Sequence, residues 1–161
     1  MHLIEFQLLF LIIVANGGPI VGATLFKRRG AWPLDLGLRL PDGQPLLGPS
    51  KTWRGVLLAL VATTVMAWLL HLPLYIGLII ASSAMVGDIL SSFIKRRLGL
   101  ESSSMALGLD QIPEALLPLL AVKGFFGLSW FTILELVMAF IILELLLSQI
   151  LYRLHIRKRP Y

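Results

Sequence analysis

The chain has no cysteine and few charged residues. Asp, Glu, Lys and Arg make up 14% of its 161 residues, whereas soluble domains carry about a quarter. The lack of cysteine excludes disulfide frameworks and thiolate metal sites, and it leaves the redox compartment open. Hydrophobic residues account for 57% of the chain and occur in long runs rather than in alternation. Such runs, each near the length needed to cross a bilayer core of roughly 30 Å, indicate an integral membrane protein.

Five apolar segments predict an all-α, polytopic membrane protein that forms one domain over residues 1–161. The expected helices cover about 3–26, 56–70, 74–94, 112–126 and 130–154. The second and fourth are short, and snorkelling by the flanking Arg54 and helix tilt compensate for this. Because the basic cluster follows the first segment instead of preceding it, we do not expect that segment to be an ordinary cleaved signal peptide.

The basic residues are distributed very unevenly between the two sides of such a bundle. Thirteen lie in 27–55, in 95–111 and in the C-terminal tail, against only Lys123 in the other connections. These thirteen are Lys27, Arg28, Arg29, Arg39, Lys51, Arg54, Lys95, Arg96, Arg97, Arg153, Arg157, Lys158 and Arg159. The positive-inside rule therefore predicts an N-out, C-in topology in the cytoplasmic membrane, with loops 27–55 and 95–111 inside. Anchoring explains the net charge of +5, so we expect anionic lipids and phosphorylated substrates as partners, and no nucleic acid.

The segment GPSKTWRG, residues 48–55, leads into the second helix. Lys51, Thr52 and Arg54 place an ammonium, a hydroxyl and a guanidinium near a helix N-terminus, where free backbone N–H groups already favour phosphate. The alternative interpretation is a set of snorkelling interface anchors, with Trp53 as an aromatic belt residue. No strand is expected before this segment, so it is not a Walker A loop.

The segment GDILSSFIKRRLG, residues 87–99, closes the third helix. Asp88, Ser91 or Ser92, and Lys95 recur at three- and four-residue spacing, so they share one helical face. A carboxylate within an apolar run is costly and is typical of a functional site. The alternative is a structural ion pair between Asp88 and Lys95, or between Asp88 and an Arg from another helix.

The segment GLDQIPE, residues 108–114, opens the fourth helix. Asp110 is a candidate N-cap, and capping alone could explain it. Asp110 and Glu114 also project on the same side. Because Asp88 and Asp110 both lie at the cytoplasmic boundary, packing could bring them together, and their hard oxygens with those of phosphate suit Mg²⁺.

Two further polar features lie inside the apolar segments. Asn16–Pro19 combines an amide with two glycines and a proline, which indicates either a binding group at depth or a kink and close packing. Glu144 lies one turn from Ser148 in the last segment. Three roles are possible for Glu144: a buried hydrogen-bonded pair with Ser148, an oligomer contact, or catalysis.

Several cations and at least two carboxylates at the inner face favour phosphoryl or nucleotidyl transfer. In that chemistry a metal bridges phosphate oxygens while Lys and Arg stabilise the charge spread over them. The alternative is a small membrane transporter or a non-catalytic assembly protein. A transporter is expected to carry polar residues through to the far side or to show repeat symmetry, and the sequence has neither.

The runs NGGP, LLGPSKTWRG, GDILSSFIKRRLG and GLDQIPEALLP occur in this order between Asn16 and Pro118. Together they resemble the CDP-archaeol synthase family, small relatives of the CDP-diacylglycerol synthases. The resemblance implies a five-helix, Mg²⁺-dependent cytidylyltransferase of phospholipid biosynthesis. Such an enzyme condenses CTP with a lipid phosphate, archaetidic-acid-like or phosphatidic-acid-like, to give CDP-lipid and pyrophosphate. Many family members carry Gly-Asp and another polar residue before the lysine, where this chain has Gly48-Pro49-Ser50.

The family's polar positions carry over to ten residues of this chain. The resemblance implies that Lys51, Asp88 and Asp110 are catalytic and that the two aspartates hold Mg²⁺. The residues expected to bind nucleotide and phosphate are Asn16, Thr52, Arg54, Lys95, Arg96, Arg97 and Gln111.

Overall fold

The protein is a bundle of helices, seen here in a computed structural model that describes residues 2–26, 29–102, 104 and 106–153. Within these ranges the chain forms five helices and no strand. The helices are α1 (Leu3–Phe26), α2 (Trp53–Leu69), α3 (Leu74–Arg97), α4 (Gln111–Phe126) and α5 (Trp130–Arg153). The expected all-α fold is therefore confirmed.

The five helices differ in length. In the described part of the chain α1, α3 and α5 are long and apolar enough to cross a membrane by length and composition, and α2 is a shorter apolar helix. The 17 residues of α2 and the 16 of α4 correspond to about 24–26 Å of helix, less than a bilayer core of roughly 30 Å. Five membrane crossings therefore remain a prediction for these two helices.

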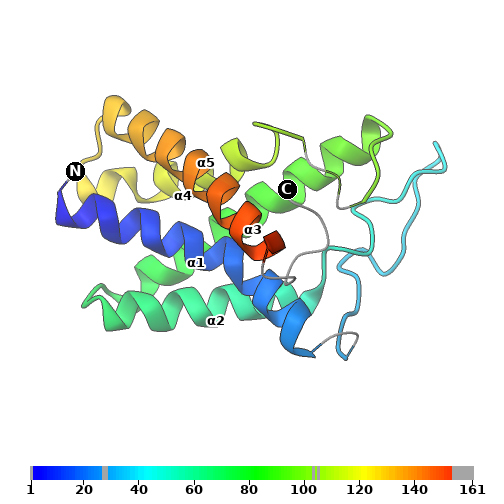
Figure 1. Cartoon of the computed structure of the whole chain (residues 1–161), viewed down its shortest axis with the longest axis horizontal. Coiled ribbons are helices and arrows are strands. Elements are labelled where there is room, and N and C mark those ends of the chain that lie inside the picture. The colour runs from blue at the N-terminus through cyan, green and yellow to red at the C-terminus, as the bar shows by residue number, and fades with distance from the viewer. Residues whose placement is uncertain (1, 27–28, 103, 105, 154–161) are drawn as a thin grey trace.

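Both long connections lie at the same end of the bundle. Figure 1 shows segments 29–52 and 98–110 at one end, and the N-terminus with the two short turns at the other. This grouping is the one that the sequence predicts, because an odd number of crossings separates the N-terminus from each long connection. It brings the polar motifs of both connections to the same place.

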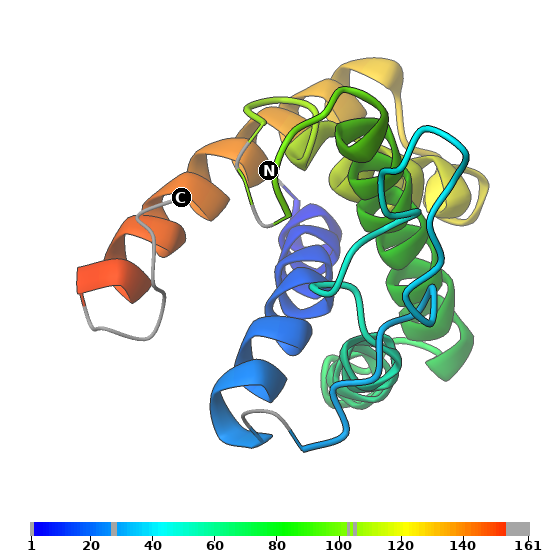
Figure 2. The ribbon, with the colours of Figure 1, turned by 90° about the vertical axis from the view of Figure 1, so that its right-hand side faces the viewer.

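Helix α3 lies between α2 and α4 and packs closely on both. A Cβ atom at Gly77 would lie 2.7 Å from Thr64 Cα, and one at Gly87 would lie 2.8 Å from the backbone nitrogen of Glu114. Both distances are shorter than real Cβ contacts, so each glycine permits a helix approach that a larger residue would block. Figure 2 shows the C-terminal half of α5 diverging from the other helices.

The hydrophobic core occupies the half of the bundle away from the long connections. It combines residues from all five helices, among them Leu8, Leu11, Ile12, Ala67, Ile76, Ile80, Leu119, Val122, Ile133, Leu136 and Phe140. Nearer the long connections a second, smaller apolar cluster consists mainly of small side chains, Ala15, Ala59 and Ala84, together with Met85. Small side chains leave room for polar groups between the helix ends.

Large apolar side chains also cover the outside of the bundle. On α5 exposed residues recur every three or four positions, as Phe131, Leu134, Met138, Ile142, Leu146 and Ile150. This spacing places them on one continuous face of the helix. An apolar face of this length is suited to contact with lipid chains, and the protein is a multi-pass membrane protein.

Two helix boundaries differ by three residues from the sequence-based expectation, and the others agree within one residue. Helix α2 begins at Trp53 rather than at 56, because Thr52 caps it by accepting a 3.2 Å hydrogen bond from Gly55 N. Helix α3 continues to Arg97 rather than ending at 94, since a helix backbone propagates past the end of an apolar run. Residues 27–28, Leu154 and the tail arginines and lysine at 157–159 lie outside the described residues.

Candidate functional site

Lys51 precedes α2 and is held on both sides by backbone hydrogen bonds. Leu34 N donates to Lys51 O at 2.8 Å, and Lys51 N donates to Gly48 O at 3.3 Å. A bridge between Pro33 and Thr52 continues this pairing toward the helix. The start and the end of the first long connection are thus paired antiparallel, with Lys51 at the point where they meet α2.

The ammonium of Lys51 forms an ion pair with the carboxylate of Asp88 on α3. Their side chains are only 20% and 18% exposed. A small pocket opens beside the pair, and Pro19 of α1, Ser50 and Met85 also line it. The pair therefore lies where α1, α2 and α3 meet, next to the small buried side chains described above.

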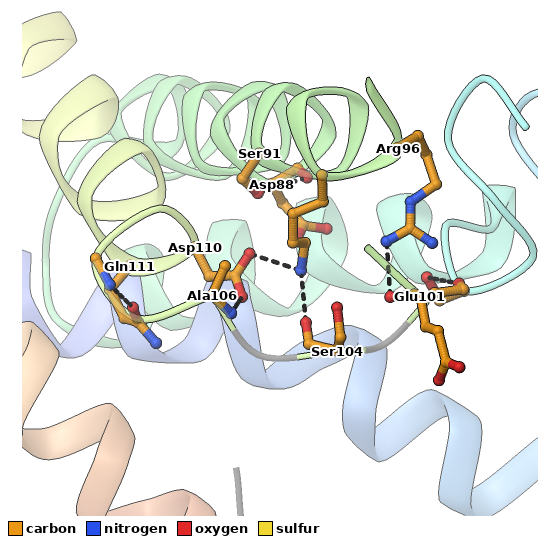
Figure 3. A network of polar contacts seen from close by, with 12 residues as sticks. Asp88, Ser91, Arg96, Glu101, Ser104, Ala106, Asp110 and Gln111 are labelled. Atoms are coloured by element: carbon orange, nitrogen blue, oxygen red, sulfur yellow. Dashed lines mark hydrogen bonds and ion pairs between the residues drawn. The ribbon is translucent and has the colours of Figure 1, made fainter. Parts of the chain in front are cut away.

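A second ion pair joins the end of α3 to the start of α4. Lys95 Nζ lies 2.7 Å from Asp110 Oδ1 and donates to Ser104 O at 2.9 Å. The other carboxylate oxygen of Asp110 accepts a 3.0 Å hydrogen bond from Ala106 N. Figure 3 shows this network at the end of α3, with Asp110 and Ser104 facing it from the connection.

Neither aspartate has the partner that the sequence-based alternatives gave it. Asp88 pairs with Lys51 instead of with Lys95 or an arginine. Asp110 occupies the N-cap position of α4, but its side chain caps no helix N–H group and points to Lys95 and Ala106. Capping therefore does not explain Asp110.

The two arginines that follow Lys95 hold the connections in place. Arg96 is 3% exposed and donates to Glu101 O at 2.7 Å. Arg97 pairs with Asp42, donates to Pro45 O at 2.7 Å and lies 5.5 Å from the Phe93 ring centre. Both guanidinium groups are thus engaged by the protein's own loops, and phosphate binding by them stays a prediction.

The remaining candidates make other hydrogen bonds and take part in neither ion pair. Asn16 donates to Ile12 O within α1 at 3.0 Å, and Gln111 accepts from Gly108 N at 2.8 Å. Arg54 donates to Arg29 O and lies 6.0 Å from the Phe26 ring centre. Of the residues predicted from the sequence, the structure thus pairs Lys51 with Asp88 and Lys95 with Asp110. The other candidates form hydrogen bonds outside these two pairs.

Glu114 is a buried residue that sequence analysis left out of the site. Its side chain is hydrogen-bonded to Asp88 and faces the charge of Glu144 on α5, and the residue is 7% exposed. Its position four residues after Asp110, on the same face of the helix, is the feature of the sequence that could have identified Glu114 as a site residue. The close approach of α4 to Gly87 places it there.

The donor set of the site fits one kind of divalent metal. Among the described residues no three His, Cys, Asp or Glu side chains group to hold a metal ion. Mg²⁺ commonly takes one or two carboxylates and completes its shell with water and substrate phosphate oxygens, so it does not need such a group. Asp88 and Asp110 are hard oxygen donors with partly exposed side chains, and they fit this pattern.

The comparisons with known proteins agree with one another. The model of a family described as CarS-like, CDP-archaeol synthase, matches residues 1–75 and 70–161. Three relatives with the name CDP-archaeol synthase come from Sulfurisphaera tokodaii, Pyrobaculum calidifontis and Hyperthermus butylicus. The first is 34% identical over 92% of this chain and 90% of its own length, and the second is 31% identical over 98% and 99%. The third is 43% identical, over 62% of this chain and 60% of its own length.

A solved structure also resembles this fold. It is described as "Structural insight into an intramembrane enzyme for archaeal membrane lipids biosynthesis". The TM-score is 0.76 and the identity 33%, over 88% of this chain and 90% of the other. The resemblance inferred from four sequence motifs is thereby confirmed, and the non-catalytic alternatives are set aside. The chain belongs to the CDP-archaeol synthase family and is an enzyme of the cytidylyltransferase class.

Proposed function

We propose that this enzyme transfers the cytidylyl group of CTP to the phosphate of an archaetidic-acid-like membrane lipid, giving CDP-lipid and pyrophosphate. The observation that carries the proposal is the double pairing of Lys51 with Asp88 and of Lys95 with Asp110 at one end of an apolar bundle. Cations for phosphate and carboxylates for metal lie within reach of a substrate that stays in the bilayer. The relatives' name supports the choice of CTP and of an archaeal lipid.

In the proposed reaction an oxygen of the lipid phosphate attacks the α-phosphorus of CTP. The new P–O bond forms as the bond between the α-phosphorus and its bridge to pyrophosphate breaks, and pyrophosphate leaves with the bridging oxygen. No covalent bond to the protein is needed, so positioning and charge stabilisation account for catalysis. Lys51 and Arg54 are assigned to the charge that grows on the α-phosphate and on pyrophosphate.

Asp88 and Asp110 are the residues that would hold Mg²⁺, which when bound neutralises phosphate charge. Substrate binding would then give both members of the Lys51–Asp88 pair a new partner. Lys51 would bind a phosphate oxygen, and Asp88 would be free to hold the metal. Lys95, Arg96, Arg97, Thr52, Asn16 and Gln111 are the further candidates for nucleotide and phosphate contacts. The proposed location is the cytoplasmic membrane, with this end of the bundle inside.

The test is incubation of the purified enzyme in detergent with each of the four nucleoside triphosphates, a lipid phosphate and Mg²⁺. We expect CDP-lipid and pyrophosphate in equal amounts with CTP, and little product with ATP, GTP or UTP. Isoprenoid ether and acyl ester lipid phosphates, compared in parallel, identify the chains. Release of pyrophosphate without a lipid product, or equal use of all four nucleotides, would overturn the proposal.

A further inference from the structure

Asp35 is a buried carboxylate that no motif of the sequence singled out. It lies in the first long connection, outside the helices, and is 9% exposed. Burying a carboxylate is costly unless hydrogen bonds compensate for the lost water. The partners of Asp35 therefore indicate what the residue does for the connection.

Three backbone N–H groups donate to the Asp35 carboxylate. Gly37 N donates to Oδ1 at 3.0 Å, and Leu47 N and Gly48 N both donate to Oδ2 at 2.9 Å. Burial raises the pKa of the Asp35 carboxyl, but these hydrogen bonds to its charged form outweigh burial and leave the pKa below its usual value. The carboxylate is thus ionised and joins the start of the connection to a segment twelve residues later.

The segment that Asp35 holds is the one that presents Lys51. Gly48 adopts φ of +93°, and its carbonyl accepts the hydrogen bond from Lys51 N. Leu34, the neighbour of Asp35, donates to Lys51 O and lines the pocket beside Asp88. The two backbone hydrogen bonds of Lys51 therefore involve Gly48, which is bound to the Asp35 carboxylate, and Leu34, which directly precedes Asp35.

Gly48 also marks the contact with the second connection. A Cβ atom at Gly48 would lie 3.1 Å from Ser102 Oγ, and Ser102 Oγ donates to Ser50 Oγ at 3.2 Å. The positive φ and the close approach both favour glycine here. A shift of the Gly48 backbone would therefore move segment 48–52, and Lys51 with it, relative to Asp88 and to Ser102.

We propose that Asp35 is a positioning residue of the active site, which fixes the backbone at Leu47 and Gly48 so that Lys51 is presented toward Asp88 and the nucleotide phosphates. The inference rests on the proposed role of Lys51. It adds a residue that touches no substrate and acts through the backbone. The isosteric change Asp35→Asn tests it, because the amide keeps a single acceptor oxygen and no charge. It can no longer accept all three backbone bonds, and those that it keeps are weaker than bonds to a carboxylate.

The decisive experiment is a double-mutant cycle on CDP-lipid formation per folded enzyme. Asp35→Asn should lower kcat by about tenfold, the range for lost hydrogen bonds to a charged group. In the Lys51→Ala background the same change should have almost no further effect, because residues that act through one another are not additive. A tenfold loss that persists in the Lys51→Ala background would overturn the proposal, since it would mean that Asp35 acts elsewhere.

Asp42→Asn is the matched control, since Asp42 is an acid of the same connection. Its side chain is 46% exposed, accepts a backbone bond from Gln44 N and pairs with Arg97. Unlike the buried Asp35, it can be replaced by Asn with water completing the contacts, and the amide oxygen can still accept from Arg97. We expect its kcat to stay within about twofold of wild type, as for exposed ion pairs. A tenfold loss in Asp42→Asn would show that any disturbance of the connection impairs the enzyme, and would also overturn the proposal.

Hydrogen exchange keeps the inference separate from the proposed function. Asp35→Asn should accelerate exchange of the Leu47, Gly48 and Lys51 amides, while amides in α3 and α4 exchange as in wild type. This holds whether or not CTP proves to be the substrate. Unchanged exchange at those three amides would contradict the inference even if the cytidylyltransferase reaction is confirmed.

Discussion

Lys51 and Asp88 form an ion pair although 37 residues separate them along the chain. Lys51, the proposed phosphate-binding cation, and Asp88, the proposed metal ligand, are thus each other's partner. Leaving either charge unpaired in this partly buried place is costly, so each side chain compensates the charge of the other. A nucleotide with its metal can replace both partners at once, whereas either one alone leaves a charge without compensation.

Removing Lys51 should impair the chemical step. We expect Lys51→Ala to lower kcat by roughly a hundredfold or more at saturating CTP and lipid phosphate, as when a positioned electrostatic contact is lost. The measurement is CDP-lipid formation per folded enzyme. Lys123→Ala is the control, because Lys123 contacts the Trp130 ring at the opposite end of the bundle. Near-normal kcat in Lys51→Ala would return Lys51 to the role of an interface anchor.

Neutralising either aspartate should abolish turnover while the protein stays folded and extractable. Asp88→Asn should have a second, opposite effect on binding, because it releases Lys51 from its ion pair. Without Mg²⁺ we expect CTP to bind this variant about fivefold more tightly than wild type, the equivalent of roughly 1 kcal/mol for a modestly exposed ion pair. Calorimetry with EDTA present measures this. Weaker metal-free binding in Asp88→Asn would argue against competition between Asp88 and phosphate for Lys51.

Two glycines in helices of the bundle should respond oppositely to the same substitution. Gly77→Ala places a Cβ 2.7 Å from Thr64 Cα and 2.9 Å from Thr63 O, so it should destabilise the bundle by about 1–3 kcal/mol through overpacking. Gly124→Ala in α4 meets no atom within 4 Å and should be neutral or slightly stabilising. Thermal unfolding in detergent compares them, and equal stability of the two variants would disprove the close α2–α3 packing.

The first connection should loosen in acid. Although burial raises the pKa of the Asp35 carboxyl, backbone hydrogen bonds leave it below the usual aspartate value. Its contribution to stability is therefore fully present above that usual value. The contribution is lost as pH falls through the folded pKa. Exchange of the Leu47 and Gly48 amides should therefore show extra acceleration only below about pH 4, and Asp35→Asn should remove that acid-dependent component. Acceleration that begins near neutral pH would point to another group.

The orientation of the bundle can be tested cleanly because the chain has no cysteine of its own. Single cysteines at Arg39 and Glu101 should be protected from an impermeant thiol reagent in intact cells. A cysteine at Lys123 should react. Labelling of Arg39→Cys from outside would place the site on the wrong face and contradict the cytoplasmic assignment.

The helices were largely predictable because long apolar runs carry a strong and local signal. The end of α3 was not, since Lys95, Arg96 and Arg97 look like loop residues once the apolar run stops. These cations favour a helix C-terminus, where the dipole is negative. Lys95 and Arg96 then donate to carbonyls of the following connection, whereas Arg97 donates to Pro45 O of the first connection.

The partners within the site were less predictable than its members. Asp88 stands out as a carboxylate in an apolar run, but helical spacing points to Lys95, whereas packing of α2 against α3 supplies Lys51. Asp35 gave no signal, because a turn held by backbone N–H groups leaves no periodic pattern in the sequence. Glu114 was visible only as a neighbour of Asp110.

The Lys51–Asp88 pair also has a consequence for how the chain enters the membrane during synthesis. Helices α2 and α3 are joined by a short turn at His71–Pro73, and Lys51 is made before Asp88. A lone carboxylate on an inserting helix costs about 2.5–3.5 kcal/mol at the bilayer centre, which is the upper bound for Asp88 near the cytoplasmic boundary. We therefore expect α2 and α3 to partition from the translocon together as a hairpin. Inserting α3 with and without the preceding segment in a translocon assay measures this, and equal insertion of both would show that α3 enters independently.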